Sequence, residues 1–261
     1  EKLLATADVF ICNWRQSPLK RAGLDWETLH EKYPKLVYGY VSGYGEKGPD
    51  KDLPGFDFTA FYARGGILGP LRDKNSLPML TVQGFGDHQV AMNLAAGVLA
   101  ALFKAKMTGE GDHVVVSLFH SAIWDISLML QASQYGADST QYPMERWKLG
   151  NPLVLCYETA DGQWLQIAMP QYDRHYPILM NAMGYPELAD DARYYPQKNL
   201  IPNREEFSAW ITAEFKKKTC DEWCKLLDAN DLPYAIAQEW DSLLEDKQAW
   251  ASDCFYEMSY S

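Results

Sequence analysis

The sequence predicts an α/β fold with a parallel sheet, followed by a smaller α+β domain. Over residues 8–136, short runs rich in β-branched residues alternate with helical patterns, as in consecutive βαβ units. After Gly150 two β-rich runs are joined through Asp161-Gly162, a pair typical of a hairpin turn, and helical patterns follow. We place the domain boundary between residues 140 and 141, which gives domains 1–140 and 141–261.

The first βαβ unit occupies the start of the chain. Asp8–Trp14, DVFICNW, is a short apolar run of the kind that parallel sheets bury. Residues 17–34 show a helical pattern with Pro18 near its start and Pro34 at its end. The stretch KLVYGYVSGYGEKGP (35–49) supplies the next strand and a loop rich in glycine.

Helical and strand patterns continue along the rest of the chain. A short helix is expected at 55–66, a strand in HVVVSLF (113–119) and a helix over 120–136. The longest helix is expected to begin at Asp87, because its apolar residues share one broad face: Val90, Ala91, Leu94, Ala95, Val98, Leu99, Leu102 and Phe103. Helices near 172–183, 204–217 and 220–229 and the apolar run YAIAQ complete the smaller domain.

Composition narrows the class of protein. With 261 residues and 47% hydrophobic residues, the chain can bury a full core. The net charge of −11 argues against a nucleic-acid surface but leaves room for an anion in a locally basic pocket. The five cysteines are scattered, and Cys220 and Cys224 lack the second pair or histidine of a zinc site, so we expect reduced thiols, no metal and a cytoplasmic location. No apolar run approaches the length of a membrane span, and no membrane partner is expected.

Asp87 is the first candidate for chemistry. Aspartate is a favoured N-cap, so its place before a helix has a structural explanation. A helix N-terminus also keeps a carboxylate ionised, and an ionised, desolvated carboxylate can attack an acyl carbon. Gly84 and Gly86 lack a Cβ and would let a backbone or a substrate approach. His88 is a possible base, but neighbouring helix residues point about 100° apart, and a polar residue in a first turn explains it as well.

Polar residues also follow the first two strands. Asn13, Arg15 and Arg21 come after the first strand, where ligands bind in parallel sheets, and basic groups there suit a phosphorylated ligand. A solvated helix face would look the same. The stretch SGYGEKGP lacks the ending of a P-loop, so it is either an active-site loop or a plain turn.

Five stretches, taken in order, resemble the class III CoA-transferases: ADVFICNWRQSPLKRAGLDWETL, PKLVYGYVSGYGEKGP, LPGFDFTAFYARGG, GFGDHQVAMNLAAGVLAALFKAKMTGEGDHVVVSLFHSAIW and ETADGQWLQIAM. This group includes formyl-CoA and carnitine CoA-transferases and the related α-methylacyl-CoA racemases. Within it the sequence is most similar to clostridial transferases of 2-hydroxy acids, such as 2-hydroxyisocaproate or phenyllactate, which act in amino acid fermentation.

The resemblance implies a Rossmann-like large domain, incomplete here, a smaller α+β domain and an interlocked homodimer. It implies that Asp87 is the catalytic aspartate and that coenzyme A is bound as a thioester substrate, with no permanently bound cofactor. The residues it assigns to substrate and CoA binding are Asn13, Arg15, Arg21, Ser42, Gly43, Tyr44, Phe56 and Asp57. Because family members have further segments at both ends, we expect this chain to be a fragment, and a non-catalytic module that binds a full-length partner is an alternative.

A comparison of residues separates transferase from racemase. Racemases of this group carry a histidine immediately before the acidic residue that corresponds to Asp57, and here that position is Phe56, which cannot move a proton. Acyl transfer through an aspartyl mixed anhydride and an aspartyl-CoA thioester is therefore the expected chemistry. The racemase reading remains as an alternative, with His88 as the replacement base. Backbone N–H groups of the glycine-rich segments are candidate oxyanion donors.

Overall fold

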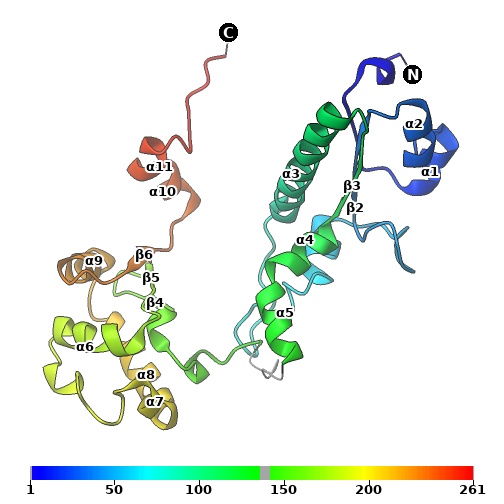
Figure 1. Ribbon diagram of the computed structural model, residues 1–261. Coiled ribbons are helices and arrows are strands. Elements are labelled where there is room, and N and C mark those ends of the chain that lie inside the picture. Colours follow the sequence, from blue (N-terminus) through cyan, green and yellow to red (C-terminus); the bar gives the residue numbers. More distant parts are fainter. Residues whose placement is uncertain (1, 136–141, 261) are drawn as a thin grey trace. The chain divides into compact units, whose positions relative to one another are not determined.

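A computed structural model describes residues 2–135 and 142–260 of the chain. It divides into two compact units, Glu1–Met144 and Glu145–Ser261. Within the described residues, the first unit carries a parallel sheet and the second an antiparallel sheet, each with helices of its own (Figure 1). The predicted boundary at residues 140 and 141 lies outside the described residues.

The parallel sheet has the order β1-β2-β3 and is formed by β1 (Val9–Cys12), β2 (Val37–Ser42) and β3 (His113–Ser117). The central strand β2 pairs with β1 from Val37 and with β3 as far as Ser42. Since all three strands run the same way, their carboxyl ends meet at one edge of the sheet. This edge is where an α/β sheet binds its ligands.

Two short helices cover one face of this sheet. The sequence predicts one helix over 17–34, whereas the structure has α1 (Gln16–Ala22) and α2 (Trp26–Lys32). The break falls at Gly23, whose φ of 65° ends the first helix. Asp25 then caps the second helix by accepting a hydrogen bond from the Thr28 N–H at 3.2 Å.

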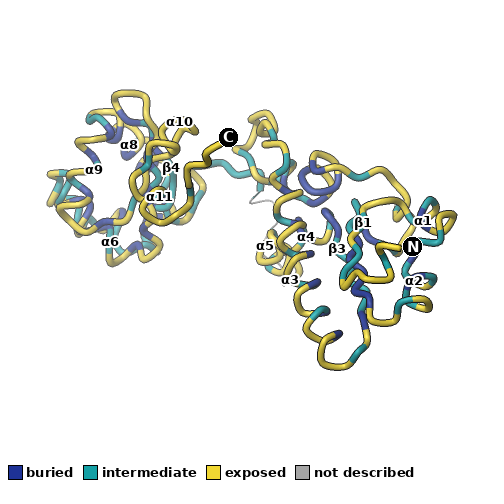
Figure 2. Tube along the Cα trace, turned by 90° about the horizontal axis from the view of Figure 1, so that it is seen from above, coloured by how far each residue is buried: buried dark blue, intermediate teal, exposed yellow. Residues whose placement is uncertain are grey.

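The long helix α3 (Phe85–Thr108) covers the opposite face of the sheet. Its buried stripe includes Leu94 and Val98, and a Cβ on Gly97 would lie only 2.6 Å from Val114 Cγ1, so the helix rests directly on β3. The sheet can cover only one stripe of a helix. Leu99 and Phe103, predicted on the core face, are therefore 66% and 71% exposed, and Figure 2 shows this exposed side along α3.

By length and composition α3 could also cross a membrane. The sequence had predicted no apolar run of the length of a membrane span. Alanine and glycine residues between the larger apolar side chains leave residues 94–103 of the helix without a polar side chain. One stripe of α3 packs on the parallel sheet.

The remaining elements of the first unit are short. The expected helix at 55–66 is η2 (Asp57–Ala63), a π-helical turn, and η1 (Leu4–Thr6) precedes β1. The helix expected over 120–136 is interrupted at Ile126, giving α4 (Leu118–Asp125) and α5 (Ser127–Gln134).

The second unit is built around β4 (Cys156–Glu158), β5 (Trp164–Ile167) and β6 (Tyr234–Ile236). As predicted, Asp161-Gly162 forms the β4–β5 turn, with Gly162 at a φ of 78°. The helices are α6 (Tyr172–Met183), α7 (Gln197–Leu200), α8 (Arg204–Phe215), α9 (Cys220–Ala229), α10 (Trp240–Leu244) and α11 (Lys247–Ala251). Short 3₁₀ turns complete it: Arg146–Lys148, Pro152–Val154, Pro186–Leu188 and Ile201–Asn203.

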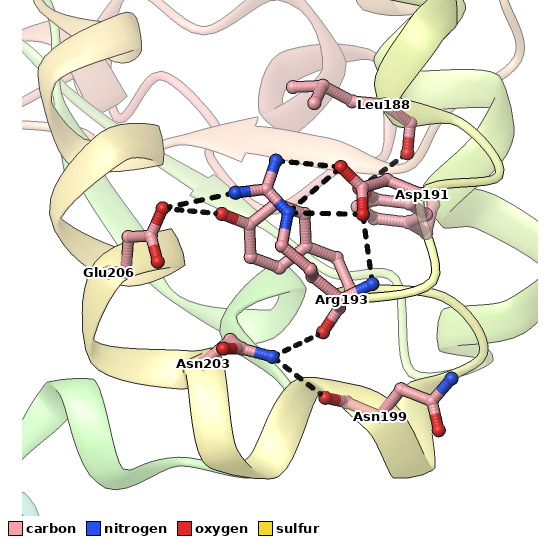
Figure 3. Close-up of polar contacts among 8 residues, drawn as sticks. Leu188, Asp191, Arg193, Asn199, Asn203 and Glu206 are labelled. Atoms are coloured by element: carbon pink, nitrogen blue, oxygen red, sulfur yellow. Dashed lines mark hydrogen bonds and ion pairs between the residues drawn. The ribbon is translucent and has the colours of Figure 1, made fainter.

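A polar cluster fixes the connection between α6 and α8 (Figure 3). The Arg193 guanidinium donates to both oxygens of Asp191, at 2.7 Å for the shortest contact, and reaches Glu206 at 3.6 Å. Asn203 donates to the Arg193 carbonyl at 2.9 Å. These groups satisfy one another, which marks the cluster as structural.

Candidate active site

A cavity of about 540 Å³ lies at the carboxyl edge of the parallel sheet. The ends of β1 and β2, the loop before η2 and the first turns of α3 supply its walls. Of the predicted site residues, the cavity is lined by Asn13, Ser42, Gly43, Phe56, Asp57 and Asp87. The rest of the lining is mostly apolar: Ile11, Cys12, Val41, Gly55, Val90, Ala91, Leu94 and Leu118. A mostly apolar hollow with a few converging polar groups is the usual form of a small-molecule site.

Asp57 forms the cap of α3. It is only 4% exposed, and its two oxygens accept hydrogen bonds from the N–H groups of Gly84 at 2.8 Å and Gly86 at 3.0 Å. Gly84 is the N-cap residue by position, while Asp87 lies inside the first turn. The expectation that Asp87 caps this helix is therefore wrong. Asp87 is instead exposed at the cavity wall, where a ligand can reach its carboxylate.

The glycines of this region permit close contacts within the protein. A Cβ on Gly86 would lie 2.3 Å from Phe61 Cγ and 2.5 Å from Asp57 Oδ1. A Cβ on Gly43 would lie 2.6 Å from the Gly55 Cα, so two loops of the cavity meet backbone to backbone. Gly86 was expected to let a backbone or a substrate come close, and the groups that come close are the side chains of Phe61 and Asp57.

Electrostatics make Asp87 harder to ionise than an ordinary aspartate. Partial burial raises the pKa of Asp87, the negative charge of Asp57 raises it further, and His88 opposes both. The expectation that the helix terminus holds Asp87 ionised does not hold, because Asp57 receives the first N–H groups of the helix. A carboxylate whose anion is poorly stabilised is more basic, which suits a nucleophile better than an inert cap.

Other predicted residues lie away from the cavity lining. Arg15 and Arg21 do not line it, and the Arg21 guanidinium donates to Ser17 Oγ at 2.7 Å. The Tyr44 ring lies beneath the Arg64 guanidinium, 4.9 Å from the ring centre. His88 is exposed and does not line the cavity either. A contact of either arginine with coenzyme A stays a prediction.

Several backbone N–H groups proposed as oxyanion donors already have partners. Those of Gly84 and Gly86 bond Asp57, and that of Gly45 donates to Ser42 Oγ at 2.8 Å. These glycines therefore do not supply a free oxyanion hole in this structure.

Sequence reasoning missed a contact among three polar residues at the loop after β2. The Gln16 side-chain amide donates to Glu46 Oε1 at 2.8 Å, and His113 Nε2 lies 3.3 Å from the same oxygen. Glu46 belongs to the loop that continues from Ser42 and Gly43, so this junction supports one wall of the site. A charged residue inside a glycine-rich loop was the available signal.

The family model for CoA-transferase family III matches residues 1–261. The chain belongs to this family. It is 49% identical over 260 residues to the cinnamoyl-CoA:phenyllactate CoA-transferase of Clostridium sporogenes, covering 99% of this chain and 63% of that protein. It is 39% identical over 259 residues to the (R)-2-hydroxy-4-methylpentanoate CoA-transferase of Clostridioides difficile, covering 99% of this chain and 64% of that protein. The chain thus spans less than two thirds of the length of these relatives.

Solved structures agree with this assignment. The crystal structure of Rv3272 from Mycobacterium tuberculosis matches with a TM-score of 0.82 at 25% identity, over 97% of this chain and 65% of that one. A CAIB/BAIF family protein from Brucella suis matches with a TM-score of 0.76 at 25% identity, over 97% of this chain and 66% of that one. The predicted mixed α/β fold and the family resemblance are confirmed.

Proposed function

We propose that the protein transfers coenzyme A between an acyl-CoA and a free 2-hydroxy acid, with Asp87 as the nucleophile. The observation that carries the proposal is the placement of Asp87: an exposed carboxylate of raised pKa in an apolar cavity at the ligand-binding edge of a parallel sheet. The names of the two clostridial relatives supply the substrate class.

The proposed reaction has four steps. The Asp87 carboxylate attacks the thioester carbonyl, which breaks the carbon–sulfur bond and gives an aspartyl–acyl anhydride and CoA thiolate. The thiolate attacks the Asp87 carbonyl and releases the first acid, which leaves an aspartyl-CoA thioester. The incoming carboxylate displaces the thiolate to form a second anhydride. The thiolate then takes the new acyl group and regenerates the Asp87 carboxylate.

The cavity favours transfer over racemisation. Moving a proton at the carbon next to the thioester needs an acid and a base on opposite sides of that carbon. Phe56 lines the cavity at the position where racemases carry histidine, while His88 lies outside the lining. The apolar side chains beside Asp87 offer neither an acid nor a base for such a proton transfer.

A panel assay tests this function. The protein is incubated with cinnamoyl-CoA and, in turn, phenyllactate, 2-hydroxy-4-methylpentanoate, formate or carnitine, and each acyl-CoA product is quantified. In parallel, deuterium uptake at the α-carbon of a 2-methylacyl-CoA is followed in heavy water. We expect exchange with the 2-hydroxy acids and no deuterium uptake. Uptake without exchange would establish a racemase, and neither activity would favour a non-catalytic module.

Two further proposals concern the assembly of the protein and its location in the cell. We propose a homodimer, since the exposed stripe of α3 includes Met92, Leu99, Phe103 and Met107, each more than 60% exposed, which a partner subunit would cover. All five cysteines are free thiols, which fits a reducing, cytoplasmic compartment.

A further inference from the structure

Three elements of the first unit converge on the side chain of Glu46. This residue lies in the loop after β2, Gln16 is the first residue of α1, and His113 begins β3. Gln16 Nε2 donates to Glu46 Oε1 at 2.8 Å, and His113 Nε2 lies 3.3 Å from the same oxygen. One carboxylate oxygen therefore bonds the loop to α1 and lies within ion-pair distance of the first residue of β3.

The His113 side of this junction is incomplete. Its Nε2 is buried and lacks an aligned hydrogen-bond partner, although Glu46 is within ion-pair distance. Both side chains are largely covered, with exposures of 20% and 23%. A proton on this nitrogen would turn the contact into an ion pair shielded from water, where charges interact more strongly than at a surface.

The surroundings keep His113 neutral at ordinary pH. Burial lowers the pKa of His113, and the acidic groups that face it oppose the effect without overcoming it: Glu46, Glu27 on α2 and Asp112. Its ring stacks on Trp26, which also stacks on His30, and the edge of Tyr38 closes the site. His113 therefore becomes charged only on acidification.

The same loop forms part of the cavity wall. Ser42 and Gly43 line the cavity, and Gly45 is bonded back to Ser42. Holding Glu46 thus holds the backbone that faces the ligand, and a wall fixed before binding improves affinity because less conformational freedom is lost on binding.

We propose that Glu46 is the positioning residue of the loop 42–48, and that protonation of His113 tightens this loop and strengthens binding of acyl-CoA. The second half of the proposal rests on the proposed function. Because linkage is reciprocal, bound CoA must in turn favour protonated His113. Neither residue belongs to the cavity lining.

Hydrogen–deuterium exchange and imidazole NMR separate the two halves. Protection factors of residues 42–48, corrected for intrinsic exchange, are measured from pH 8 to pH 5 in the free protein, and the His113 titration is followed with and without CoA. We expect protection to rise as His113 titrates and CoA to raise its pKa. Glu46→Gln keeps an acceptor for Gln16 but should abolish both the rise of protection on acidification and the shift of the His113 titration by CoA. Gln16→Ala should instead lower the protection of residues 42–48 at every pH, by about tenfold.

Glu110→Gln removes the same charge at an exposed position and is the matched control, expected to behave as wild type. Equal, pH-independent protection in wild type and Glu46→Gln would overturn the proposal for the loop. A His113 titration unmoved by bound CoA would overturn its link to binding. Calorimetry with CoA is run alongside, and a wild-type protein that fails to bind CoA would overturn the proposed function, while the exchange data in the free protein still decide the role of Glu46.

Discussion

The two aspartates at the start of α3 differ in their burial and in their contacts. Asp57 is buried and accepts hydrogen bonds from the N–H groups of Gly84 and Gly86. Asp87 follows Gly86 in the helix and lines the cavity. The charge of the first makes the second harder to ionise. Helix capping, which the sequence pattern placed on Asp87, belongs to Asp57, and the nucleophilic role that we propose for Asp87 is separate from it.

Replacing Asp57 tests this coupling. Asp57→Asn removes the negative charge that raises the pKa of Asp87, so the acid limb of the pH profile of kcat/KM should move to lower pH. It also leaves one backbone N–H of the cap poorly satisfied, which should lower the free energy of unfolding by about 1–3 kcal/mol. The profile and a urea titration measure the two effects, and an unmoved acid limb would show that the two carboxyl groups do not interact.

Replacing Asp87 should separate stability from activity. Its folded-state pKa lies above the ordinary 3.8, so the ionised form is disfavoured by folding and reduces stability at pH values above the folded pKa. Asp87→Asn should therefore raise the free energy of unfolding at pH 7, with the gain fading toward pH 3.8 and absent below it. CoA exchange should fall by more than about 10⁴-fold. Equal stability of the two proteins at pH 7 would contradict the assigned electrostatics.

At the scale of elements, the position of α3 depends on the missing side chain of Gly86. A methyl group there would collide with Phe61 and Asp57, so Gly86→Ala should destabilise the protein by about 1–3 kcal/mol and displace Asp87. Gly69→Ala is the matched control, because a Cβ there meets nothing within 4 Å. Thermal unfolding compares the two variants. Equal midpoints would show that α3 can shift without cost.

The sequence predicted the type of most elements but not how they contact one another. Apolar periodicity identified β1, β2, β3 and α3, because local pattern and burial agree there. The breaks at Gly23 and Ile126 were missed, since a helical period continues across both. The Asp57 cap is a contact between η2 and α3 set by tertiary packing, and no local pattern encodes it. For the same reason Asp87 was given the wrong structural role, while its catalytic role stays a prediction.

At the scale of the whole molecule, the two units have separate cores. The second unit buries its own aromatic cluster, including Tyr176, Phe207, Phe215 and Trp223. Both units also leave large apolar side chains exposed, such as Phe103 on α3 and Trp240 on α10. We propose the exposed stripe of α3 as the subunit interface, because its apolar side chains lie along one long helix.

A charge on that stripe should dissociate the proposed dimer. Phe103→Glu places a carboxylate at a position that is 71% exposed, where it costs little in the isolated subunit and much in an apolar interface. Leu53→Glu adds the same charge to an exposed loop of the same unit and should leave assembly unchanged. Sedimentation velocity measures the oligomeric state of the wild type and of both variants. A monomeric wild type, or a Phe103→Glu dimer as stable as wild type, would contradict the assignment.

Covalent trapping on Asp87 tests the central claim most directly. The protein is mixed with cinnamoyl-CoA and quenched with hydroxylamine, and the peptide that contains Asp87 is examined by mass spectrometry. The proposed anhydride and thioester both predict a hydroxamate on Asp87 that depends on acyl-CoA and is absent from Asp87→Ala. An unmodified Asp87 in a protein that is exchanging CoA, together with exchange retained by Asp87→Ala, would contradict the account.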